Sequence, residues 1–330
     1  MRVLLISNQA GNAEGVGNPI IYRLTDALAA DERIEKVTFE PFVYSIRSLR
    51  LLRKTAKKFD IIHVHFGGLY ALFIYYLLIG INVKKIITFH GTDIHAKAVK
   101  TSKSLKEKLK IILNQKASFL CIRLYDKCGF VALDLCRYVP PRLSKMMSDK
   151  AFIQKLGVDY RSFSVLDKSF AQTYLKLKPG KYVLFSNISN TSIKRQDIAE
   201  KIIEKLKGDY RLLLMRGVKP IEVPFYINAC DFVLITSDEE GSPNIVREAL
   251  TLNKPVFSVD VGDVADQLKG LVNSAIISRD PANAAFLIMQ TMQKPYIDNT
   301  RDRQKDILDI VLINRPIVDL YCLLNSREKN

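Results

Sequence analysis

Residues 239–250 read EEGSPNIVREAL and directly follow the apolar run FVLITSD. Two carboxylates, Glu240 and Glu248, bracket a Gly-Ser-Pro-Asn corner. Pro243 and Asn244 stand where a helix is expected to begin, and the backbone N–H groups of a helix start attract anions. Carboxylates beside such a site are costly unless they bind hydroxyl groups or a cation, which favours a polyol ligand. Loop solvation combined with an ordinary glutamate on a helix face is the competing interpretation.

Histidines follow two apolar runs in the first half of the chain. His63 and His65 alternate in IIHVHF, and His90 ends the run IITFH. Two histidines on one face of a strand also have a metal-ligand spacing. No carboxylate or cysteine accompanies them nearby, so we expect a packed strand end rather than a metal site. A lone histidine such as His90 is most often structural.

A glycine-rich stretch, SNQAGNAEGVGNP, follows the first apolar run and precedes a helical pattern. Gly15 and Gly17 are its candidates for close approach to a ligand. A lone G-x-G loop is weak support for dinucleotide binding, and no acidic residue follows a second strand in the expected way.

The elements that must position these residues follow one rhythm, in which short apolar runs alternate with helical patterns. The strands read as continuous apolar runs, which is typical of a parallel sheet covered on both faces. Ligands of such sheets bind beyond the carboxyl ends of the strands. In the first half, we expect strands at 3–7, 37–42, 61–66, 85–89, 130–133 and 151–156. In the second half, we expect strands at 182–189, 210–217, 231–237, 255–260 and 274–278.

Two interruptions divide the chain. Residues 157–180 lose the alternating rhythm and are expected to link two domains, and Pro316 interrupts a long helical pattern at 300–326. We expect an α/β protein with two Rossmann-like, doubly wound parallel-sheet domains that face each other across a cleft. The predicted boundaries are 1–165, 166–300 and 301–330, and the last segment is a helix that packs back on the first domain.

Length and composition agree with two globular domains. The 330 residues, 48% of them hydrophobic, are enough for two cores. The start MRVLLISN is expected to be a buried strand rather than a signal peptide, and the apolar stretch 67–81 is shorter than the roughly 20 residues of a membrane span. The five cysteines have no disulfide-ladder spacing, which indicates free thiols in a reducing cytoplasm.

Positive charge is concentrated in the first half of the chain. Residues 1–150 hold 25 Lys and Arg against 12 Asp and Glu, whereas residues 151–330 hold 25 against 22. This asymmetry indicates an anionic partner. The basic helical patterns SLRLLRKTAKK and SLKEKLKIILNQK fit either a solvated face or an interfacial helix on an anionic membrane. Nucleic acid is not expected, because no reader module or basic patch with stacking aromatics is present.

The stretch LITSDEEGSPNIVREAL, followed by NKPVFSVDVGDV, resembles the retaining glycosyltransferases of the GT-B fold, in particular family 4 (glycosyl transferases group 1). The E-x7-E signature of that family falls on Glu240 and Glu248. The resemblance implies that Glu240 contacts the hydroxyls of the donor sugar and that Glu248 contacts the nucleotide ribose. The loop formed by Gly241, Ser242, Pro243, Asn244 and Ile245 would offer its backbone N–H groups to the sugar and the phosphates.

The same resemblance assigns roles upstream. Lys194 falls on the family lysine that neutralises the donor diphosphate, and a fixed cation there stabilises the leaving phosphate. The arginine that the family usually has near the strand end is missing, and Asn187 takes its place. Either Arg195 substitutes for that arginine, or the diphosphate is bound by one cation and by more backbone N–H groups. His90 would approach the donor sugar and β-phosphate. Solvated loop cations are the competing interpretation of Lys194 and Arg195.

On the acceptor side, the resemblance leaves Asp93 either to orient its loop or to touch the acceptor. His65 is expected near the acceptor, and Gly15 and Gly17 would face the diphosphate and the acceptor. The implied activity is transfer of a sugar from a nucleotide-diphosphate sugar, with retention, to a glycan or lipid-linked acceptor, at family level in bacterial surface polysaccharide assembly.

No metal and no other cofactor is expected for this reaction. The expected location is the cytoplasm, including the inner face of the membrane. The alternatives are a sugar-nucleotide-binding protein without turnover and a GT-B sugar-nucleotide epimerase.

Overall fold

The computed structural model describes residues 1–8, 20–95, 104–187, 192–294 and 300–326. It divides into two compact units. The first contains Met1–Leu156 together with Ile313–Asn330, and the second contains Gly157–Leu312. Among the described residues, no helix has both the length and the apolar character that a membrane crossing needs.

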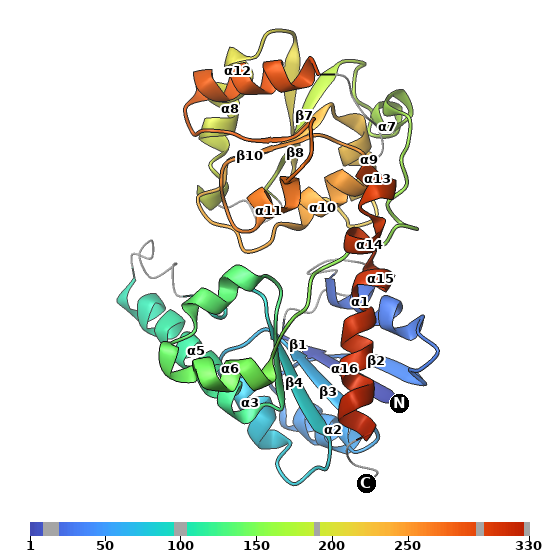
Figure 1. Cartoon of the computed structure of the whole chain (residues 1–330), viewed down its shortest axis with the longest axis vertical. Coiled ribbons are helices and arrows are strands. Elements are labelled where there is room, and N and C mark those ends of the chain that lie inside the picture. Colours follow the sequence, from blue (N-terminus) through green and yellow to red (C-terminus); the bar gives the residue numbers. More distant parts are fainter. Residues whose placement is uncertain (9–19, 96–103, 188–191, 295–299, 327–330) are drawn as a thin grey trace. The chain divides into compact units, whose positions relative to one another are not determined.

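A six-stranded parallel sheet forms the centre of the first unit, in the order β2-β1-β3-β4-β5-β6 (Figure 1). Continuous apolar strands such as VLLI of β1 are buried on both faces, as the sequence predicts. The strands are β1 (Arg2–Ser7), β2 (Lys36–Pro41), β3 (Ile61–His65), β4 (Lys84–Phe89), β5 (Lys127–Phe130) and β6 (Ala151–Ile153).

Helices cover both faces of this sheet. On one face, α1 and the terminal α16 pack on β1 and β3 through residues that include Leu24 and Ile317. On the other face, α3 and α5 contribute Ile74 and Ile122 to a second core. The helices of this unit are α1 (Ile20–Ala29), α2 (Ile46–Ala56), α3 (Leu69–Leu77), α5 (Leu105–Leu124), α6 (Ser144–Lys150) and α16 (Arg315–Ser326), with short 3-10 turns at Leu133–Tyr138 and Pro141–Leu143.

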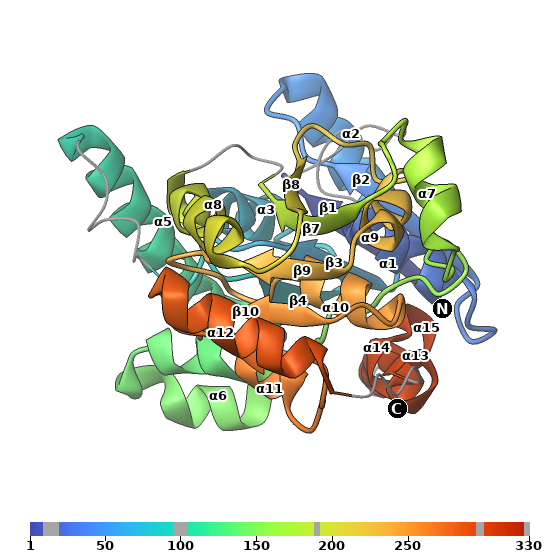
Figure 2. The same cartoon turned by 90° about the horizontal axis from the view of Figure 1, so that it is seen from above.

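The second unit has a five-stranded parallel sheet in the order β11-β10-β9-β7-β8. Its strands are β7 (Lys181–Ser186), β8 (Tyr210–Met215), β9 (Phe232–Ile235), β10 (Val256–Ser258) and β11 (Ala275–Ile276). Its main helices are α7 (Lys168–Tyr174), α8 (Gln196–Lys205), α9 (Val223–Ala229), α10 (Asn244–Thr251), α11 (Val264–Leu268) and α12 (Pro281–Met292). Helix α8 lies beside α12, and α7 lies beside α9 (Figure 2).

The predicted linker is part of the second unit. Val158 is 1% exposed and forms a parallel bridge with Asp309. Its N–H donates to Leu308 O over 2.7 Å, and its carbonyl accepts from Ile310 N–H over 2.9 Å. The first segment of the first unit therefore ends at Leu156, whereas the sequence predicts a boundary at 165.

The predicted tail, 301–330, is shared between the units. Helices α13 (Thr300–Arg303) and α14 (Lys305–Leu308) lie in the second unit, and the chain enters the first unit at Ile313, at the end of α15 (Ile310–Ile313). Pro316 stands in the first turn of α16, where the missing N–H costs no hydrogen bond.

Candidate functional site

The loops at the carboxyl edge of the second sheet carry most of the predicted site residues. Asn187 follows β7, the stretch 236–243 connects β9 to α10, and the stretch 259–263 connects β10 to α11. Neighbouring parallel strands β7, β9 and β10 bring these loops to one edge.

Lys194 and Glu240 form an ion pair at this edge. Lys194 Nζ lies 2.6 Å from Glu240 Oε1, and the Ser237 hydroxyl donates to the same oxygen over 2.7 Å. The two charged side chains are 27% and 14% exposed, so the pair is partly shielded from water. The structure thus joins a cation and a carboxylate that stand far apart in the sequence, and it orients both before any ligand arrives.

Two residues that the sequence analysis did not single out hold the loop of Glu240. The Thr236 hydroxyl donates to the carbonyls of Lys194 and Arg195 over 3.0 and 2.8 Å. The Arg279 guanidinium donates to the carbonyls of Thr236 and Ser237 over 3.0 and 2.8 Å. Both residues support the loop through contacts between segments that are distant in the sequence, so no local sequence pattern predicts this.

Arg195 is engaged with carboxylates. Its guanidinium contacts both oxygens of Asp197 over 2.9 Å and Asp238 Oδ1 over 3.3 Å. The neighbouring Asp197 carboxylate raises the pKa of Arg195. The backbone of Arg195 is left-handed, with φ 53°, at the start of α8. Its charge therefore stabilises the loop, and the geometry gives little support to Arg195 as a replacement for the missing arginine.

The cradle loop, Gly241–Ile245, leads into α10. Pro243 is the residue before the helix, and Asn244 is its first residue. The side chains of Ser242 and Asn244 both accept hydrogen bonds from Arg247, which fixes this turn.

The other two predicted donor residues of this unit are buried. Glu248 is 7% exposed on α10, one residue after Arg247. Asn187 is 2% exposed, and its N–H donates to Met215 O over 3.2 Å. The residue at the position where an arginine was expected is therefore a buried amide, Asn187.

The two loops that follow β9 and β10 touch each other. Gly262 has φ 59°, and a Cβ atom at this position would overlap the carbonyl oxygen of Gly241. The Ser242 hydroxyl donates to Asp263 Oδ2 over 2.7 Å. The second loop thus supports the cradle from the side.

In the first unit, Asp93 organises the loops that follow β3 and β4. Its carboxylate accepts from the N–H groups of Gly67, His90 and Gly91 over 2.6, 3.0 and 2.8 Å. Burial raises the pKa of Asp93, and these hydrogen bonds oppose that rise. Of the two predicted roles, orientation of the loop is the one that this geometry supports.

His65 and His90 lie together at the carboxyl ends of β3 and β4. His65 Nδ1 is 3.1 Å from His90 Nε2, and the His90 ring stacks on Phe66 with centroids 4.0 Å apart. Burial lowers the pKa of His90 to about 3, so its ring is neutral at physiological pH. A neutral imidazole here can exchange hydrogen bonds with a hydroxyl group without adding charge.

His63 belongs to a buried hydrogen-bond network instead. Its Nδ1 lies 2.5 Å from the Tyr321 hydroxyl of α16, and its Nε2 lies 2.8 Å from Thr88 Oγ1. The described parts of the chain contain no group of three or more His, Cys, Asp or Glu side chains that could hold a metal ion. Gly15 and Gly17 lie outside the described residues.

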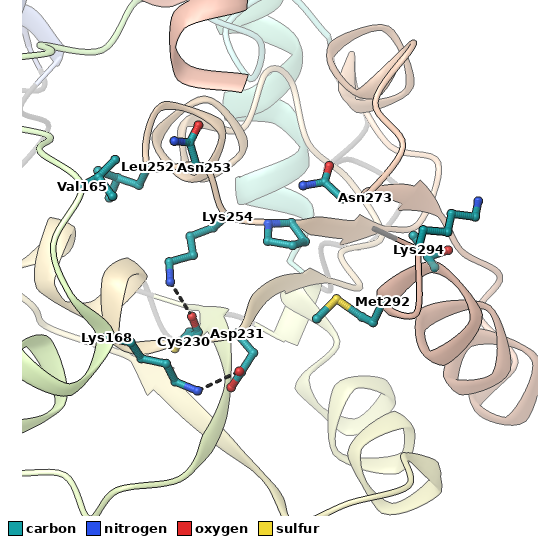
Figure 3. A pocket seen from close by; sticks show the side chains of 12 residues that line it. Val165, Lys168, Cys230, Asp231, Leu252, Asn253, Lys254, Asn273, Met292 and Lys294 are labelled. Carbon is teal, nitrogen blue, oxygen red and sulfur yellow. Dashed lines mark hydrogen bonds and ion pairs between the residues drawn. The ribbon is translucent and has the colours of Figure 1, made fainter. Parts of the chain in front are cut away.

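A pocket of about 310 Å³ opens at the opposite, amino edge of the second sheet (Figure 3). Lys168 and Asp231 pair across it over 2.7 Å, and Lys254 Nζ donates to Cys230 O over 2.9 Å. None of the predicted site residues lines the pocket.

Searches with the sequence find no matching protein-family model and no matching curated protein. Solved structures do match in their fold. Sucrose-phosphate synthase from Thermosynechococcus elongatus has a TM-score of 0.74 and 14% identity over 99% of both chains. HepE from Anabaena, in complex with UDP-glucose, has a TM-score of 0.70 and 15% identity over 97% of this chain and 99% of that one.

A glycosyltransferase from Rickettsia africae has a TM-score of 0.67 and 14% identity over 98% of both chains. At these identities the likeness shows the fold. Together with the two parallel-sheet α/β units, it shows that the chain has the GT-B fold, as the sequence predicts.

Proposed function

We propose that the protein is a glycosyltransferase that moves a sugar from a nucleotide-diphosphate sugar to an acceptor, with retention at the anomeric carbon. The observation that carries the proposal is the Lys194–Glu240 pair beside the start of α10, at the carboxyl edge of the second sheet. Structural neighbours of the same fold also support it, since one of them binds UDP-glucose.

In this proposal each group has one task. Lys194 and the backbone N–H groups of the loop 241–245, to which every residue except Pro243 contributes, bind the diphosphate and stabilise the charge that develops as the sugar leaves. Glu240 accepts hydrogen bonds from the sugar hydroxyls, and Glu248 accepts from the ribose. His90 supports the sugar and the β-phosphate as a neutral imidazole. The leaving phosphate helps to deprotonate the acceptor, so the reaction needs neither a protein base nor a metal.

The first experiment measures which nucleotide sugar raises the melting temperature, because a ligand that binds only the folded state stabilises it. The second measures transfer and hydrolysis of that sugar by wild type, Lys194→Ala and Glu240→Ala. We expect each substitution to lower turnover by at least 100-fold, equivalent to about 3 kcal/mol, while the variants stay folded. Lys168→Ala, in the pocket at the amino edge, is the matched control and should keep its activity. Unchanged turnover in both site variants would refute the proposed site.

A second candidate is a sugar-nucleotide-binding protein without turnover. The engagement of Arg195 by two carboxylates favours it, because the missing arginine then has no evident replacement. This candidate predicts a thermal shift with a nucleotide sugar but no product with any acceptor. A GT-B epimerase, by contrast, would form product without an acceptor, so the same assay separates all three activities.

We further propose that the first unit docks on an anionic membrane, where a lipid-linked acceptor for surface polysaccharide assembly would be found. Exposed apolar side chains gather around α2 and α3. Phe42 lies 4.6 Å from Tyr44 and 6.2 Å from Phe73, measured between ring centroids. The exposed members of this apolar patch are Val43, Tyr44, Ile46, Phe73, Tyr76 and Ile79.

Cations flank the apolar patch. Arg47, Arg50 and Lys54 are exposed on α2. Arg53 donates to the carbonyls of Leu77 and Ile79 at the end of α3, which ties the two helices together. Apolar side chains beside cations are typical of surfaces that insert shallowly among anionic lipid headgroups. This surface would keep the enzyme at the cytoplasmic face of the membrane.

Co-sedimentation at low salt tests the docking surface. We expect the protein to bind phosphatidylglycerol-containing vesicles but not pure phosphatidylcholine vesicles, and Ile46→Glu with Tyr76→Glu to lower binding by at least tenfold. Ile221→Glu, at an equally exposed apolar position of the second unit, is the control. Equal binding of the double variant and wild type would contradict this part of the proposal.

A further inference from the structure

Arg247 is a buried cation on α10, two residues after the cradle loop, and the sequence alone assigns it no role. It is 5% exposed on α10. Its Nη1 donates to Ser242 Oγ over 2.5 Å, and its Nη2 donates to Ser242 O over 3.1 Å and to Asn244 Oδ1 over 2.5 Å. Burying a guanidinium costs free energy unless it is hydrogen-bonded. A buried arginine that binds the adjacent loop therefore indicates that it maintains a specific loop conformation.

The three contacts fall on both sides of Pro243. The proline ring fixes its own φ and provides no N–H, so Pro243 cannot donate a backbone hydrogen bond within the turn. Its carbonyl accepts one from the N–H of Val246 over 3.2 Å. The forked guanidinium ties the turn from outside, because it binds the oxygens of Ser242 before the proline and of Asn244 after it. The direction of the N–H groups in the cradle loop, Gly241–Ile245, is thereby set before any ligand binds.

The tie extends to the neighbouring loop. The Ser242 hydroxyl, which accepts from Arg247, donates in turn to Asp263 Oδ2 over 2.7 Å. The Asp263 Oδ1 atom accepts from Gln267 Nε2 over 2.6 Å. One buried arginine therefore connects the cradle loop to the loop after β10 and to helix α11.

The charge of Arg247 suits an anion at the same place. Burial lowers the pKa of Arg247, and the carboxylates of Asp263 and Glu248 oppose that fall. A guanidinium nevertheless stays protonated in proteins. Its Nε–H finds no hydrogen-bond acceptor among the described residues, although it is buried. The positive charge lies at the start of α10, where the helix dipole also favours negative ligands.

We infer that Arg247 is the positioning residue that holds the cradle loop in its diphosphate-binding conformation. It acts through the backbone N–H groups of Gly241, Ser242, Asn244 and Ile245 rather than by touching the donor. The inference rests on the proposed function, and it answers how this chain binds a diphosphate where the expected arginine is replaced by Asn187.

Calorimetric titration with a nucleoside diphosphate and with the corresponding nucleoside tests the inference. Wild type is titrated with UDP, ADP and GDP, and the tightest of them is used for the variants. We expect Arg247→Gln to lose at least tenfold in affinity for the diphosphate and less than threefold for the nucleoside. Arg247→Lys keeps the positive charge but loses the forked guanidinium. Its affinity for the diphosphate should lie between those of wild type and Arg247→Gln.

Arg301→Gln is the matched control. Arg301 is also a partly buried arginine of the second unit that donates to backbone carbonyls, those of Tyr160, Phe163 and Thr251. We expect its substitution to lower the melting temperature and to leave the diphosphate affinity within twofold. If Arg247→Gln does not fold, Asn244→Ala removes one arm of the tie and should still lower the ratio of diphosphate to nucleoside affinity.

The outcomes separate the two proposals. If wild type binds none of the three diphosphates, the proposed function fails and the inference fails with it. If wild type binds one and Arg247→Gln binds it equally well, the inference alone is wrong. An equal loss for diphosphate and nucleoside would also overturn the inference, because it would indicate a general loss of structure.

Discussion

At the residue scale, the candidate site residues of each unit are held by contacts within that unit. Glu240 binds Lys194 and Ser237, Asp93 binds three backbone N–H groups, and Arg247 ties the cradle loop. Catalytic groups that are oriented in advance need little reorganisation when charge develops during a reaction. A ligand that reaches Lys194 meets an ammonium group already fixed by a carboxylate.

Gly262 gives a prediction at this scale. Substitution to alanine should destabilise the protein by about 1–3 kcal/mol, from backbone strain at positive φ and from the overlap with Gly241 O, and it should weaken nucleoside diphosphate binding. Gly217→Ala has nearly the same φ, 58°, but no atom lies within 4 Å of the added Cβ. Urea unfolding and calorimetry of both variants isolate the effect of the overlap; equal behaviour would show that the two loops can separate freely.

Glu240, Glu248 and Lys194 are candidates in the sequence because they match the motifs of the family that it resembles. The contacts between them and the other loop residues could not be predicted, because Thr236, Arg279 and Arg247 act on segments distant in sequence or across a turn. Arg247 reads as an ordinary charged residue of an exposed helix face. In the structure it is 5% exposed, and its guanidinium binds Ser242 and Asn244.

At the scale of elements, most of the strands and helices follow from the pattern of apolar runs, because parallel strands are buried on both faces. Strand β5 is the exception: it covers Lys127–Phe130, whereas the sequence predicts a strand at 130–133. Gly129 lies within it because a Cβ there would overlap Thr88 and Phe152. Because glycine has no apolar side chain, a strand that needs glycine for steric reasons gives a weak apolar pattern in the sequence.

Helix α16 gives a prediction at this scale through the fully buried His63, which contacts its Tyr321. Burial lowers the pKa of His63 to about 3, below the ordinary value near 6.5. The unfolded state therefore binds more protons between pH 6.5 and 3. This group's stabilisation is complete above pH 6.5 and falls as the pH decreases, by about 1.4 kcal/mol per unit.

The neutral variant His63→Gln tests this dependence. Urea unfolding followed by circular dichroism at pH 7.5 and 4.5 should show a smaller loss of unfolding free energy on acidification in the variant than in wild type. The absolute stability of the variant at pH 7.5 does not enter the comparison. Equal losses in the two proteins would mean that His63 does not titrate on unfolding.

At the scale of the whole molecule, the two-domain organisation is visible in the sequence because the strand-helix rhythm stops and starts again near residue 157. The boundary itself is not visible, because Val158 pairs with Asp309, which lies far along the chain. The second unit is one continuous segment, whereas the first consists of two. Sequence patterns report local structure, and this division depends on contacts at long range.

Truncation tests this division. A chain that ends at Leu312 should lose the fold of the first unit, because Ile317, Val318 and Tyr321 of α16 then no longer cover β1 and β3. The second unit should remain folded and resist limited proteolysis. A chain that ends at Ser326 keeps α16 whole and is the control. Protection of both units in the shorter chain would contradict this account.

Because the first unit is discontinuous in the sequence, it also determines when during synthesis the protein can finish folding. A ribosome makes α16 after the entire second unit, so until then the apolar face formed by Val3, Leu5 and Ile61 has α1 but not α16 to cover it. Domains generally fold as units during synthesis. The continuous second unit can therefore complete its core first, and the first unit, although it begins the chain, completes its own core last.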